Sequence, residues 1–514
     1  MAGPAGVIPT RPRSPRETSL RTVAEWLKDA LLEIRGSDPE MTVTGITISS
    51  ERVLSGDLYV APAGARSHGA SYAVQAVSSG ARAVLTDPAG ADICDGLDVP
   101  VLVVERPRAV VGELAARVYG RPAARLKLVA VTGTQGKTTT TRLAEAALTE
   151  AGLRAAVVGT VGTRVNGTDV ASSLTTPEAP DLHALFGVMV EEQVAACAME
   201  VSSHALVMGR VDGVVFDVAC FTNLGRDHLD FHADEEEYFD AKADLFTPER
   251  ARLGLVNIDD EHGRRLRDEA TIPVRTFSTE GADADWWADD VRVEPAGSTF
   301  TVHTPTGDSV PARVPLTGDY NVSNALCAIA ALGEAGIDPR LVAEGMAAST
   351  GVPGRLERVD AGQGFLAVVD YAHKPDAVAA ALTALRPQAR RLLVVLGAGG
   401  DRDPGKRPLM GEIAARLADV LVVTDDNPRS EDPATIRAAM LAGADQVPDG
   451  ERAELHEQGD RRAAIRLAVS LAADGDVLVV AGKGHETGQE VHGTVHPFDD
   501  REVLLEELRR GVRR

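Results

Sequence analysis

Short apolar runs alternate with stretches of helical periodicity along most of the chain. The run from Leu126 to Val131 is apolar and rich in β-branched residues, which predicts a buried strand of a parallel sheet. Residues 138–149 follow with apolar side chains at helical spacing, and Gly152 is a stop signal for this helix. Further strand-like runs lie at residues 45–48, 57–61, 83–86, 101–104, 155–159, 194–200, 215–221, 253–257, 365–370, 392–396, 420–423 and 477–480. Such repeated strand–helix units predict an α/β protein with mostly parallel sheets.

Two breaks in this pattern divide the chain into three expected α/β domains. Tyr-Gly-Arg-Pro at residues 119–122 is typical of a linker, and Gly-Val-Pro-Gly at residues 351–354 marks the second break. We therefore expect a smaller N-terminal domain over residues 21–123, a central P-loop-type domain with a mostly parallel sheet over 124–350, and a Rossmann-like domain over 351–514. A chain of 514 residues is too long for one core, which agrees with this division.

The first 20 residues have a different composition from the rest. They contain four prolines and several arginines but few apolar side chains, so they cannot bury enough surface to order themselves. We expect residues 1–20 to form a disordered extension. Its basic character could also contact an acidic partner.

Composition and charge exclude several classes of function. The formal net charge of −23 argues against nucleic acid or an anionic membrane as a general partner. No apolar segment approaches the roughly 18 residues of a membrane span, and the N-terminus lacks the apolar core of a signal peptide. The four cysteines are scattered, which predicts buried thiols in a reducing cytosol. We expect a cytoplasmic monomer without membrane insertion.

The first sign of chemistry lies between the first central strand and its helix. Thr-Gly-Thr-Gln-Gly-Lys-Thr at residues 132–138 offers loop N–H groups and a helix N-terminus to a phosphate. Lys137 would add a charge near the β- and γ-phosphates, and the Thr138 hydroxyl a Mg2+ ligand. An ordinary P-loop has glycine at position 131, where Val131 stands. The alternative is a glycine turn with a solvated lysine, but the strand–loop–helix context favours binding of ATP or GTP.

Polar residues follow two further predicted strands. Glu200 ends an apolar run, and a carboxylate at this end of a central strand is placed to hold Mg2+ directly or through water. Alternatively, Glu200 caps the next helix. The segment 221–232 concentrates polar side chains directly after a strand, which is more typical of a site than of a turn. Within it, His228 could bind a metal or orient a phosphate.

A lysine on the apolar face of a predicted helix is a third candidate. Residues 234–246 open with an Asp-x-x-Glu cap, and spacings of three and four place Tyr238, Lys242 and Phe246 on one face. Lys242 either extends along that face to solvent or is desolvated and reacts with CO2 to give an anionic carbamate. The residues alone leave both alternatives open.

The last third of the chain adds weaker signals. Asn321 and Asn324 share a helix face that suits adenine or ribose contacts, although helix capping explains one of them equally well. Glycine turns at residues 354–358, 369–376 and 397–407 add cations and carboxylates. Together they suggest one wall of a cleft for an anionic substrate.

Taken in order, these elements resemble the Mur ligases of peptidoglycan synthesis. The resemblance covers nearly the whole chain beyond the N-terminal extension, and it is greatest to the members that add the third residue of the peptide. The strings that match the family pattern are TGTQGKTTT, MEVSSHAL, FTNLGRDHLDFH, YFDAKADLF, GDYNVSNALCA, GRLE, VDYAHKPDA, GGDRDPGKRPLMG, DNPR and AGKGHE. Ten ordered matches are far more specific than any single motif.

The resemblance implies an ATP-dependent amide ligase with ATP and Mg2+ as cofactors. ATP would phosphorylate the D-glutamate carboxylate of UDP-MurNAc-L-Ala-D-Glu, and an incoming amine would then displace the phosphate. Lys137, Glu200, His228 and Lys242 match the family's catalytic positions. Lys242 matches the carbamoylated lysine (N6-carboxylysine), and with Thr138, Glu200 and His228 it belongs to the implied metal site.

Three sets of binding residues are carried over by the same resemblance. The set for ATP is Gly133, Thr134, Gln135, Gly136, Lys137, Thr138, Thr139, Asn321, Asn324, Arg355 and Asp370. The set for the UDP-MurNAc-dipeptide is Ser50, His68, Gly69, Ala70, Thr175, Thr176, Ser202, Met208 and Arg210. The set for the added amino acid is Arg402, Asp426, Asn427, Pro428, Arg429, Gly482 and Glu486.

The chain departs from the family pattern at several of these positions. Ser-Ser-Glu at residues 49–51 stands where Asp-Ser-Arg is common, which makes the uridine contacts less certain. Met208 replaces a frequent glutamine, Gln135 the usual asparagine, and Lys374 a usual threonine. None of these changes removes a charge that the implied chemistry requires.

Arg429 bears on which amino acid is added. meso-Diaminopimelate differs from lysine by a second carboxylate at the far end of its side chain, and a guanidinium can bind that group bidentately. In the family, Asp-Asn-Pro-Arg goes with diaminopimelate. We favour meso-diaminopimelate over L-lysine, also because a buried unpaired arginine would be costly.

Two other classes of enzyme remain as alternatives. A folylpolyglutamate-type ligase shares the core fold, but the first domain and the Asp-Asn-Pro-Arg loop argue against it. A P-loop NTPase switch would turn over nucleotide without the UDP-sugar peptide. The general base for the amine stays open, with His373 and Asp370 as candidates by position only.

Overall fold

The structure is a computed structural model that describes residues 9–36, 38, 40–64, 66–172, 174–225, 227, 231–281, 283–294 and 296–512. It divides the chain into two compact units. The first unit comprises Met1–Trp287 and Cys327–Gly345, and the second comprises Ala288–Leu326 and Met346–Arg514. This division differs from the expected domain boundaries near residues 123 and 350, which stay predictions.

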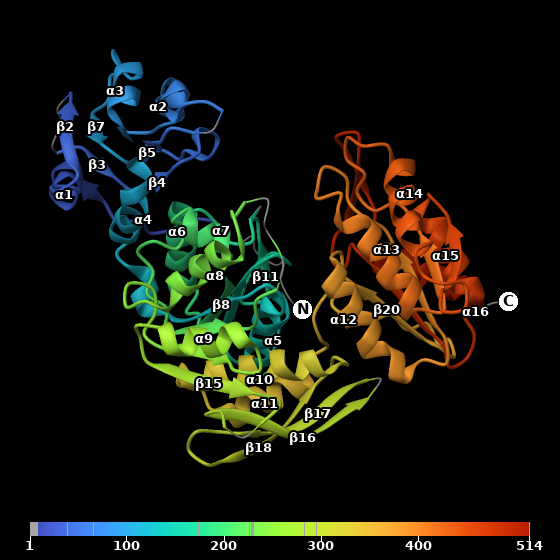
Figure 1. Cartoon of the computed structure of the whole chain (residues 1–514). Coiled ribbons are helices and arrows are strands. Elements are labelled where there is room, and N and C mark those ends of the chain that lie inside the picture. Colours follow the sequence, from blue (N-terminus) through green and yellow to red (C-terminus); the bar gives the residue numbers. More distant parts are fainter. Residues whose placement is uncertain are drawn as a thin grey trace, which may run out of the picture. The chain divides into compact units, whose positions relative to one another are not determined.

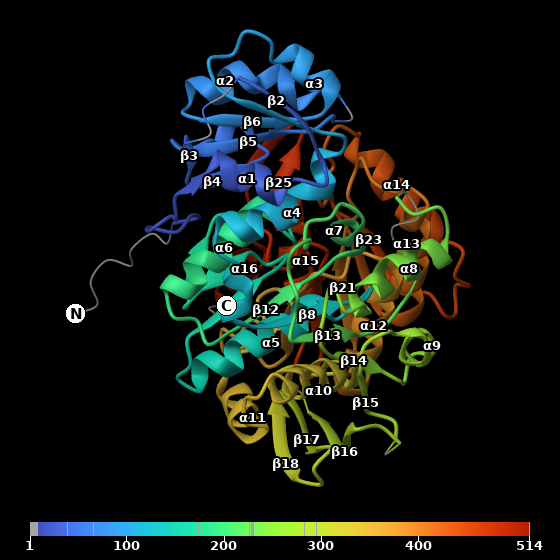
Figure 2. The same cartoon turned by 90° about the vertical axis from the view of Figure 1, so that its left-hand side faces the viewer.

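The N-terminal lobe of the first unit, residues 18–119, is built on a small sheet (Figures 1 and 2). Its strand order is β2-β7-β6-β5-β4, in which β4 to β7 are parallel and β2 runs antiparallel to β7. The strands are β2 (Leu31–Arg35), β4 (Gly45–Thr47), β5 (Asp57–Ala61), β6 (Ala83–Thr86) and β7 (Val101–Val104). The helices are α1 (Leu20–Trp26), α2 (Ala73–Ser78), α3 (Pro88–Ile93) and α4 (Pro107–Val118).

The remainder of the first unit contains a larger sheet around β8 (Figure 2). The strand order is β11-β10-β9-β12-β8-β13-β14-β15-β16-β17-β18, in which the last two strands are β17 (Gly297–His303) and β18 (Ser309–Val314). The pairs from β9 to β16 are parallel. The strands are β8 (Lys127–Thr132), β9 (Ala155–Val158), β10 (Thr163–Val165), β11 (Thr168–Val170), β12 (Ala196–Glu200), β13 (Val218–Phe221), β14 (Gly254–Asn257), β15 (Val274–Ser278) and β16 (Trp286–Glu294). Asn-Gly at residues 166–167, flanked by Thr-Arg-Val and Thr-Asp-Val, predicts a hairpin. This prediction is confirmed, because both residues have positive φ between the antiparallel strands β10 and β11.

Helices cover this sheet and bury one core. They are α5 (Lys137–Glu150), α6 (Ala179–Glu191), α7 (Ser203–Val207), α8 (Glu235–Ala243) and α9 (Glu261–Glu269). Helices α10 (Asp319–Glu334) and α11 (Pro339–Ala348) cross the division between the units. Leu128, Phe186, Phe221 and Phe246 are fully buried in the core, which fixes β8 between its neighbours and so positions the loop that follows it.

The second unit has its own parallel sheet (Figure 1). Its order is β19-β20-β24-β21-β22-β23, with only β19 antiparallel. The strands are β19 (Glu357–Arg358), β20 (Leu366–Asp370), β21 (Leu392–Leu396), β22 (Val420–Val423), β23 (Glu454–Glu457) and β24 (Val477–Ala481). Side chains of α12 (Pro375–Leu385), α13 (Lys406–Leu417) and α14 (Pro433–Ala444) pack in one core cluster, and those of α15 (Arg461–Leu471) and α16 (Asp500–Val512) in another.

The second unit also contains two antiparallel hairpins, of which the first forms the edge of the 11-stranded sheet and the second is a separate two-stranded sheet. One joins β17 (Gly297–His303) to β18 (Ser309–Val314), and the other joins β25 (Gly488–Val491) to β26 (Thr494–Pro497). The predicted α/β class with mostly parallel sheets is confirmed. All four cysteines are free and buried, as expected. Within the described residues, no helix is long and apolar enough to cross a membrane.

Residues 9–20 are ordered, which differs from the expectation of disorder, and residues 1–8 of the same segment lie outside the described residues. Strand β1 (Thr18–Ser19) pairs with β3 (Thr42–Val43), and Ser19 caps α1 by accepting from the Thr22 N–H. Arg11 forms an ion pair with Asp57. Composition suggested that this segment could not order itself alone, and it is instead ordered by contacts with distant parts of the chain.

Candidate active site

The glycine loop after β8 has the backbone conformation that its sequence requires. Gly133 has φ of 140° and Gly136 has φ of 86°, both in the region that favours glycine. A Cβ on Gly133 would lie 2.0 Å from Thr222 Oγ1, so this position also lacks room for a side chain. The loop then enters α5, whose N-terminus is a natural site for an anion.

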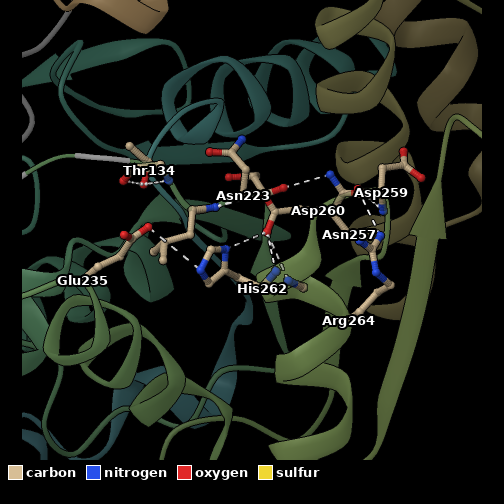
Figure 3. Close-up of polar contacts among 12 residues, drawn as sticks. Thr134, Asn223, Glu235, Asn257, Asp259, Asp260, His262 and Arg264 are labelled. Carbon is tan, nitrogen blue, oxygen red and sulfur yellow. Dashed lines mark hydrogen bonds and ion pairs between the residues drawn. The ribbon is translucent and has the colours of Figure 1, made fainter.

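The segment after β13 forms hydrogen bonds with the glycine loop. The Thr134 N–H donates to Asn223 O at 2.9 Å, and the Gln135 N–H donates to Asn223 Oδ1 at 2.9 Å. Asn257 and Asp260 in turn hold the segment after β13 (Figure 3). Asn257 donates to Thr222 O at 2.9 Å, and Asp260 accepts from the Leu224 N–H at 3.3 Å. These hydrogen bonds therefore fix the conformation of the loop.

Two lysines approach this loop from different elements. Lys137 donates to the carbonyls of Gly133 at 2.7 Å and Thr134 at 3.1 Å. Lys242, on α8, donates to Gly133 O at 3.1 Å, and its Nζ lies 4.3 Å from the centre of the Tyr238 ring. Lys242 is only 1% exposed, which excludes the alternative that it extends to solvent. The carbamate stays a prediction.

Glu200 lies at the end of β12, directly beside β8. It pairs with Val131 in the sheet register and is 1% exposed. Its carboxylate accepts from Thr160 N at 2.8 Å and Thr160 Oγ1 at 3.1 Å. A Cβ on Gly159 would lie 2.3 Å from Glu200 Oε1, so the glycine makes room for this carboxylate.

The predicted metal ligands are only partly described. His228 lies outside the described residues, as do Arg226 and Asp230 of the same polar loop. In the described part of the chain, no group of three or more His, Cys, Asp or Glu side chains could hold a metal ion. The predicted set of Thr138, Glu200, His228 and Lys242 therefore stays a prediction.

Several residues predicted to bind the UDP-MurNAc-dipeptide gather next to Glu200. Thr176 donates to Glu200 O at 2.9 Å, and Thr175 Oγ1 lies 3.1 Å from Thr160 Oγ1. Arg210 donates to Thr176 O at 3.4 Å. Ser202 caps α7 by accepting from the Ala205 N–H, and Met208 Sδ accepts from Arg210 at 3.4 Å.

The remaining residues of that set lie in the N-terminal lobe. His68 Nδ1 accepts from the Ala70 N–H at 3.0 Å, which assigns the proton to Nε2, 3.0 Å from Asp87. Gly69 packs against the backbone, because a Cβ there would lie 2.9 Å from Ala61 Cα. Ser50 begins the short 3-10 helix Ser50–Arg52.

A second polar cluster lies in the second unit, after β22 and β24. Asn427 donates to Glu486 Oε2 at 2.8 Å and accepts from Lys483 Nζ at 3.0 Å. Lys483 is fully buried and was not predicted, although it lies in the AGKGHE string. A Cβ on Gly482 would lie 2.5 Å from Asp426 Oδ2, so this glycine keeps the space next to Asp426 open.

Arg429 is partly exposed and already paired, which corrects the expectation of a buried, unpaired arginine. Its NH1 donates to Gly400 O at 2.7 Å, and its Nε lies 3.4 Å from Glu490 Oε2. Its side chain is 24% exposed. The backbone of Arg429 has φ of 51° and forms two hydrogen bonds with the β25–β26 hairpin. The Arg429 N–H donates to Glu490 O, and Arg429 O accepts from the His492 N–H. The cost of an unpaired charge therefore gives no argument for diaminopimelate.

The other predicted residues of the second unit are held by local contacts. Asn321 donates to Thr317 O at 2.8 Å and accepts from Asn324 at 3.2 Å. The Arg355 guanidinium lies 4.7 Å from the centre of the Tyr371 ring. Arg402 is exposed and donates to Asp401 O at 3.3 Å. The carbonyl of Pro428 packs against Gly400, where a Cβ would lie 2.0 Å away.

The two candidate bases have shifted acidities. Burial raises the pKa of Asp370, whose carboxylate accepts from the N–H groups of Leu356 at 2.7 Å and Ala372 at 2.8 Å. Burial lowers the pKa of His373 to about 4, so this imidazole is neutral at pH 7. A neutral histidine can accept a proton, whereas Asp370 has its oxygens engaged by the backbone.

Comparisons with known proteins agree with this geometry along nearly the whole chain. The Mur ligase middle domain matches residues 131–332, the Mur ligase glutamate ligase domain matches 354–484, and the Mur ligase family catalytic domain matches 42–119. The chain belongs to the Mur ligase family.

Two curated relatives and one solved structure are similar over nearly their full length. UDP-N-acetylmuramoyl-L-alanyl-D-glutamate--2,6-diaminopimelate ligase of Streptomyces coelicolor is 54% identical over 98% of both chains. UDP-N-acetylmuramyl-tripeptide synthetase of Leifsonia xyli subsp. xyli is 44% identical over 99% of both chains. A solved UDP-N-acetylmuramoyl-L-alanyl-D-glutamate--2,6-diaminopimelate ligase has a TM-score of 0.68 and 33% identity, and the match covers 97% of this chain and 100% of that one.

Proposed function

We propose that this protein is an ATP-dependent amide ligase that adds meso-diaminopimelate to the D-glutamate of UDP-MurNAc-L-Ala-D-Glu. The observation that carries the proposal is the full-length similarity to relatives with this name, at 54% and 55% identity. The preformed phosphate loop and the polar cluster around Asn427 supply the groups that such a reaction needs. We also propose that the protein acts as a monomer in the cytoplasm.

The reaction balances in two steps. The D-glutamate carboxylate attacks the γ-phosphorus of ATP, forming an acyl phosphate and releasing ADP. The amine of the incoming amino acid then attacks the acyl carbon, the bond from that carbon to the phosphate oxygen breaks, and the amine loses a proton. Activation is needed because phosphate is a far better leaving group than the hydroxide or oxide ion that an unactivated carboxylate would have to expel.

The phosphate loop and Lys137 have the first task. The N–H groups of the first turn of α5 point towards the helix N-terminus, where they can bind the phosphates. Lys137 can turn from the carbonyls of Gly133 and Thr134 to the transferring phosphate, where its charge offsets the negative charge of the transition state. The fixed loop supplies position as well as charge.

Oxygen donors near the loop fit Mg2+. The Thr138 hydroxyl, the Glu200 carboxylate and a carbamate on Lys242 are the hard ligands that this ion prefers. When bound, Mg2+ neutralises charge on the phosphate oxygens. The two hydrogen bonds from Thr160 orient Glu200 for this role.

Burial of Lys242 supports its carbamoylation. Lys242 is 1% exposed, so its amine is held next to the phosphate loop and away from bulk water. That amine attacks CO2, a nitrogen–carbon bond forms, and one proton leaves for solvent. The product is an anion that can bind a cation beside the phosphates.

The cluster of the second unit fits an amino acid with charges at both ends. With Nε near Glu490 and NH1 on Gly400 O, the Arg429 guanidinium has further N–H groups for a carboxylate. Within the described residues, Asp426 Oδ2 is buried without a hydrogen-bond partner, which suits an ammonium group. These features favour meso-diaminopimelate over L-lysine.

An assay with each amino acid tests the substrate. Purified enzyme with ATP, Mg2+ and UDP-MurNAc-L-Ala-D-Glu is offered meso-diaminopimelate or L-lysine, and the product is measured by mass spectrometry. We expect kcat/KM to be about 10–10²-fold higher for meso-diaminopimelate, because its second carboxylate can accept charge-assisted hydrogen bonds from the remaining N–H groups of Arg429. Preferential turnover of L-lysine would overturn the assignment.

A further inference from the structure

Residues 9–14, within the segment expected to be disordered, are fixed at one end by Arg11. Its NH1 donates to Asp57 Oδ1 at 3.0 Å and its NH2 to Asp57 Oδ2 at 3.2 Å, a bidentate pair. NH1 also lies 2.6 Å from the Tyr119 hydroxyl. Arg11 is 14% exposed and Asp57 is 3% exposed, so this contact is largely withdrawn from water. A Cβ on Gly45 would lie 2.6 Å from Arg11 NH1, so the lack of a side chain at Gly45 leaves room for the guanidinium.

The next three residues contact a different element, helix α6. Pro12 packs on Gly187, where a Cβ would lie 2.6 Å from Pro12 Cγ. The N–H groups of Arg13 and Ser14 donate to the two carboxylate oxygens of Glu191 at 2.9 and 3.0 Å. One carboxylate thus holds two consecutive peptide groups. Within four residues, the chain passes from the N-terminal lobe to the C-terminal end of α6.

The other end of α6 lies beside residues predicted to bind the UDP-MurNAc-dipeptide. The helix starts at Ala179, three residues after Thr176, and Glu178 at its N-cap pairs with Arg210 at 3.1 Å. Asp181 in its first turn pairs with Arg52 of the N-terminal lobe at 2.6 Å. Thr10 and Arg52 also line a cavity of about 50 Å³ together with Leu174, Pro177 and Asp181.

We propose that residues 9–14 form a strap that fixes the N-terminal lobe on α6 and thereby aligns the two halves of the UDP-MurNAc-dipeptide site. The inference rests on the proposed function, because that substrate is expected to contact His68 in the lobe and Arg210 near α6. Arg11 and Glu191 are positioning residues in this account. Arg11 belongs to the strap and Glu191 accepts hydrogen bonds from it, and neither is among the residues predicted to bind the substrate.

The strap lowers the cost of binding a substrate that spans two lobes. Binding to lobes that are already aligned loses less conformational freedom than binding to lobes that must be ordered. The close contact of Gly112 on α4 with Asp212, where a Cβ would lie 2.4 Å away, is one fixed point between the lobe and the rest of the unit. The Arg52–Asp181 pair is another fixed point, in the first turn of α6, and the strap adds a further one at the C-terminal end of this helix.

The test uses single substitutions in the full-length chain. Arg11→Gln removes the bidentate pair, and Glu191→Ala removes the acceptor for the two strap N–H groups from the exposed side of α6. Arg11→Lys keeps the charge. Arg16→Gln removes the same charge from an exposed position of the same segment and is the matched control. KM and kcat are measured for UDP-MurNAc-L-Ala-D-Glu, ATP and the amino acid, below the unfolding temperature of each variant.

We expect Arg11→Gln and Glu191→Ala each to raise the KM for UDP-MurNAc-L-Ala-D-Glu about ten-fold. Because both act on one strap, the double variant should show much less than the product of the two effects. The KM for ATP and kcat should stay within about two-fold, with Arg11→Lys intermediate and Arg16→Gln unchanged.

Two results overturn the strap. One is an unchanged KM for the UDP-sugar peptide in Glu191→Ala, which is informative even if Arg11→Gln fails to fold. The other is an equal rise of all three KM values. Failure of the wild-type enzyme to form any peptide product contradicts the proposed function instead, so the two failures are distinguishable.

Discussion

At the scale of single residues, glycines and lysines carry most of the argument. Gly133 leaves room for the Thr222 side chain, and Gly159 leaves room for the Glu200 carboxylate. Glu200 ends β12, which pairs with β8, the strand that leads into the phosphate loop. Lys137 and Lys242 converge on the carbonyl of Gly133 from separate helices. The nitrogens of both lysines therefore lie next to the same turn of the phosphate loop.

Loss of the Lys137 charge should affect catalysis far more than folding. We expect Lys137→Met to lower kcat about 10²–10³-fold, because the transition state loses a fixed positive charge. Steady-state kinetics measure kcat, and thermal unfolding should be nearly unchanged. Lys28→Met, at an exposed position, is the control. A loss of less than about three-fold would show that Lys137 does not contact the transferring phosphate.

Carbamoylation of Lys242 should make activity depend on CO2. Enzyme stripped of CO2 at mildly acidic pH should lose most activity and regain it with bicarbonate. Incubation with 13C-bicarbonate should give a carbamate carbon signal by NMR, absent in Lys242→Met. An active enzyme without that signal contradicts the carbamate.

At the scale of elements, periodicity predicted most strands and the hairpin, because both depend on local sequence. The run before Gly133 is β8 and the stretch after it is α5, within a residue or two of the expected bounds. Residues 9–14 could not be predicted, since their order comes from Asp57, Gly187 and Glu191, which lie far away in the sequence. The composition of a segment indicates how much apolar surface it can bury by itself, and not which distant residues of the chain it contacts.

A buried ion pair joins α15 to α16 in the second unit. Arg461 and Asp500 are both fully buried, and Arg461 also donates to Ala481 O at 2.9 Å, at the end of β24. We expect Arg461→Ala to lower the free energy of unfolding of this unit by about 3–5 kcal/mol, because Asp500 is left buried and unpaired. Arg462→Ala, which breaks an exposed pair with Glu506, should cost less than about 1 kcal/mol in the same denaturant experiment. Equal effects would contradict this account.

His183 on α6 should make the first unit sensitive to acid. Burial lowers its pKa to about 4, whereas an unfolded histidine titrates near 6.5. Below about pH 6.5 the unfolded chain binds the proton first, so stability is complete above that pH and is lost as the pH falls towards 4.

The loss from His183 should reach about 3 kcal/mol at pH 4. Denaturant unfolding at pH 7 and pH 4.5 should show a smaller pH effect in His183→Gln, whose amide can still donate to Asp212 O as the imidazole does at 2.9 Å. An identical pH effect in variant and wild type would mean that His183 is already charged in the folded protein.

At the scale of the whole molecule, the two units contain different parts of the predicted site. The first holds the phosphate loop, Glu200 and Lys242, and the second holds the cluster of Asp426, Asn427 and Arg429. The family resemblance predicted both sets, because their motifs are short and contiguous. It could not predict Lys483 or Glu490 as partners of Asn427 and Arg429, since hydrogen bonds across a loop and a hairpin leave no spacing pattern.

The central claim is that ATP turnover makes an amide bond, and one measurement tests it most directly. ADP and the UDP-MurNAc-tripeptide are quantified together with purified enzyme, ATP, Mg2+, UDP-MurNAc-L-Ala-D-Glu and meso-diaminopimelate. We predict equal amounts of the two products, and almost no ADP when either cosubstrate is omitted. ADP formation that continues at the same rate without the UDP-sugar peptide or the amino acid would contradict the ligase and favour an NTPase.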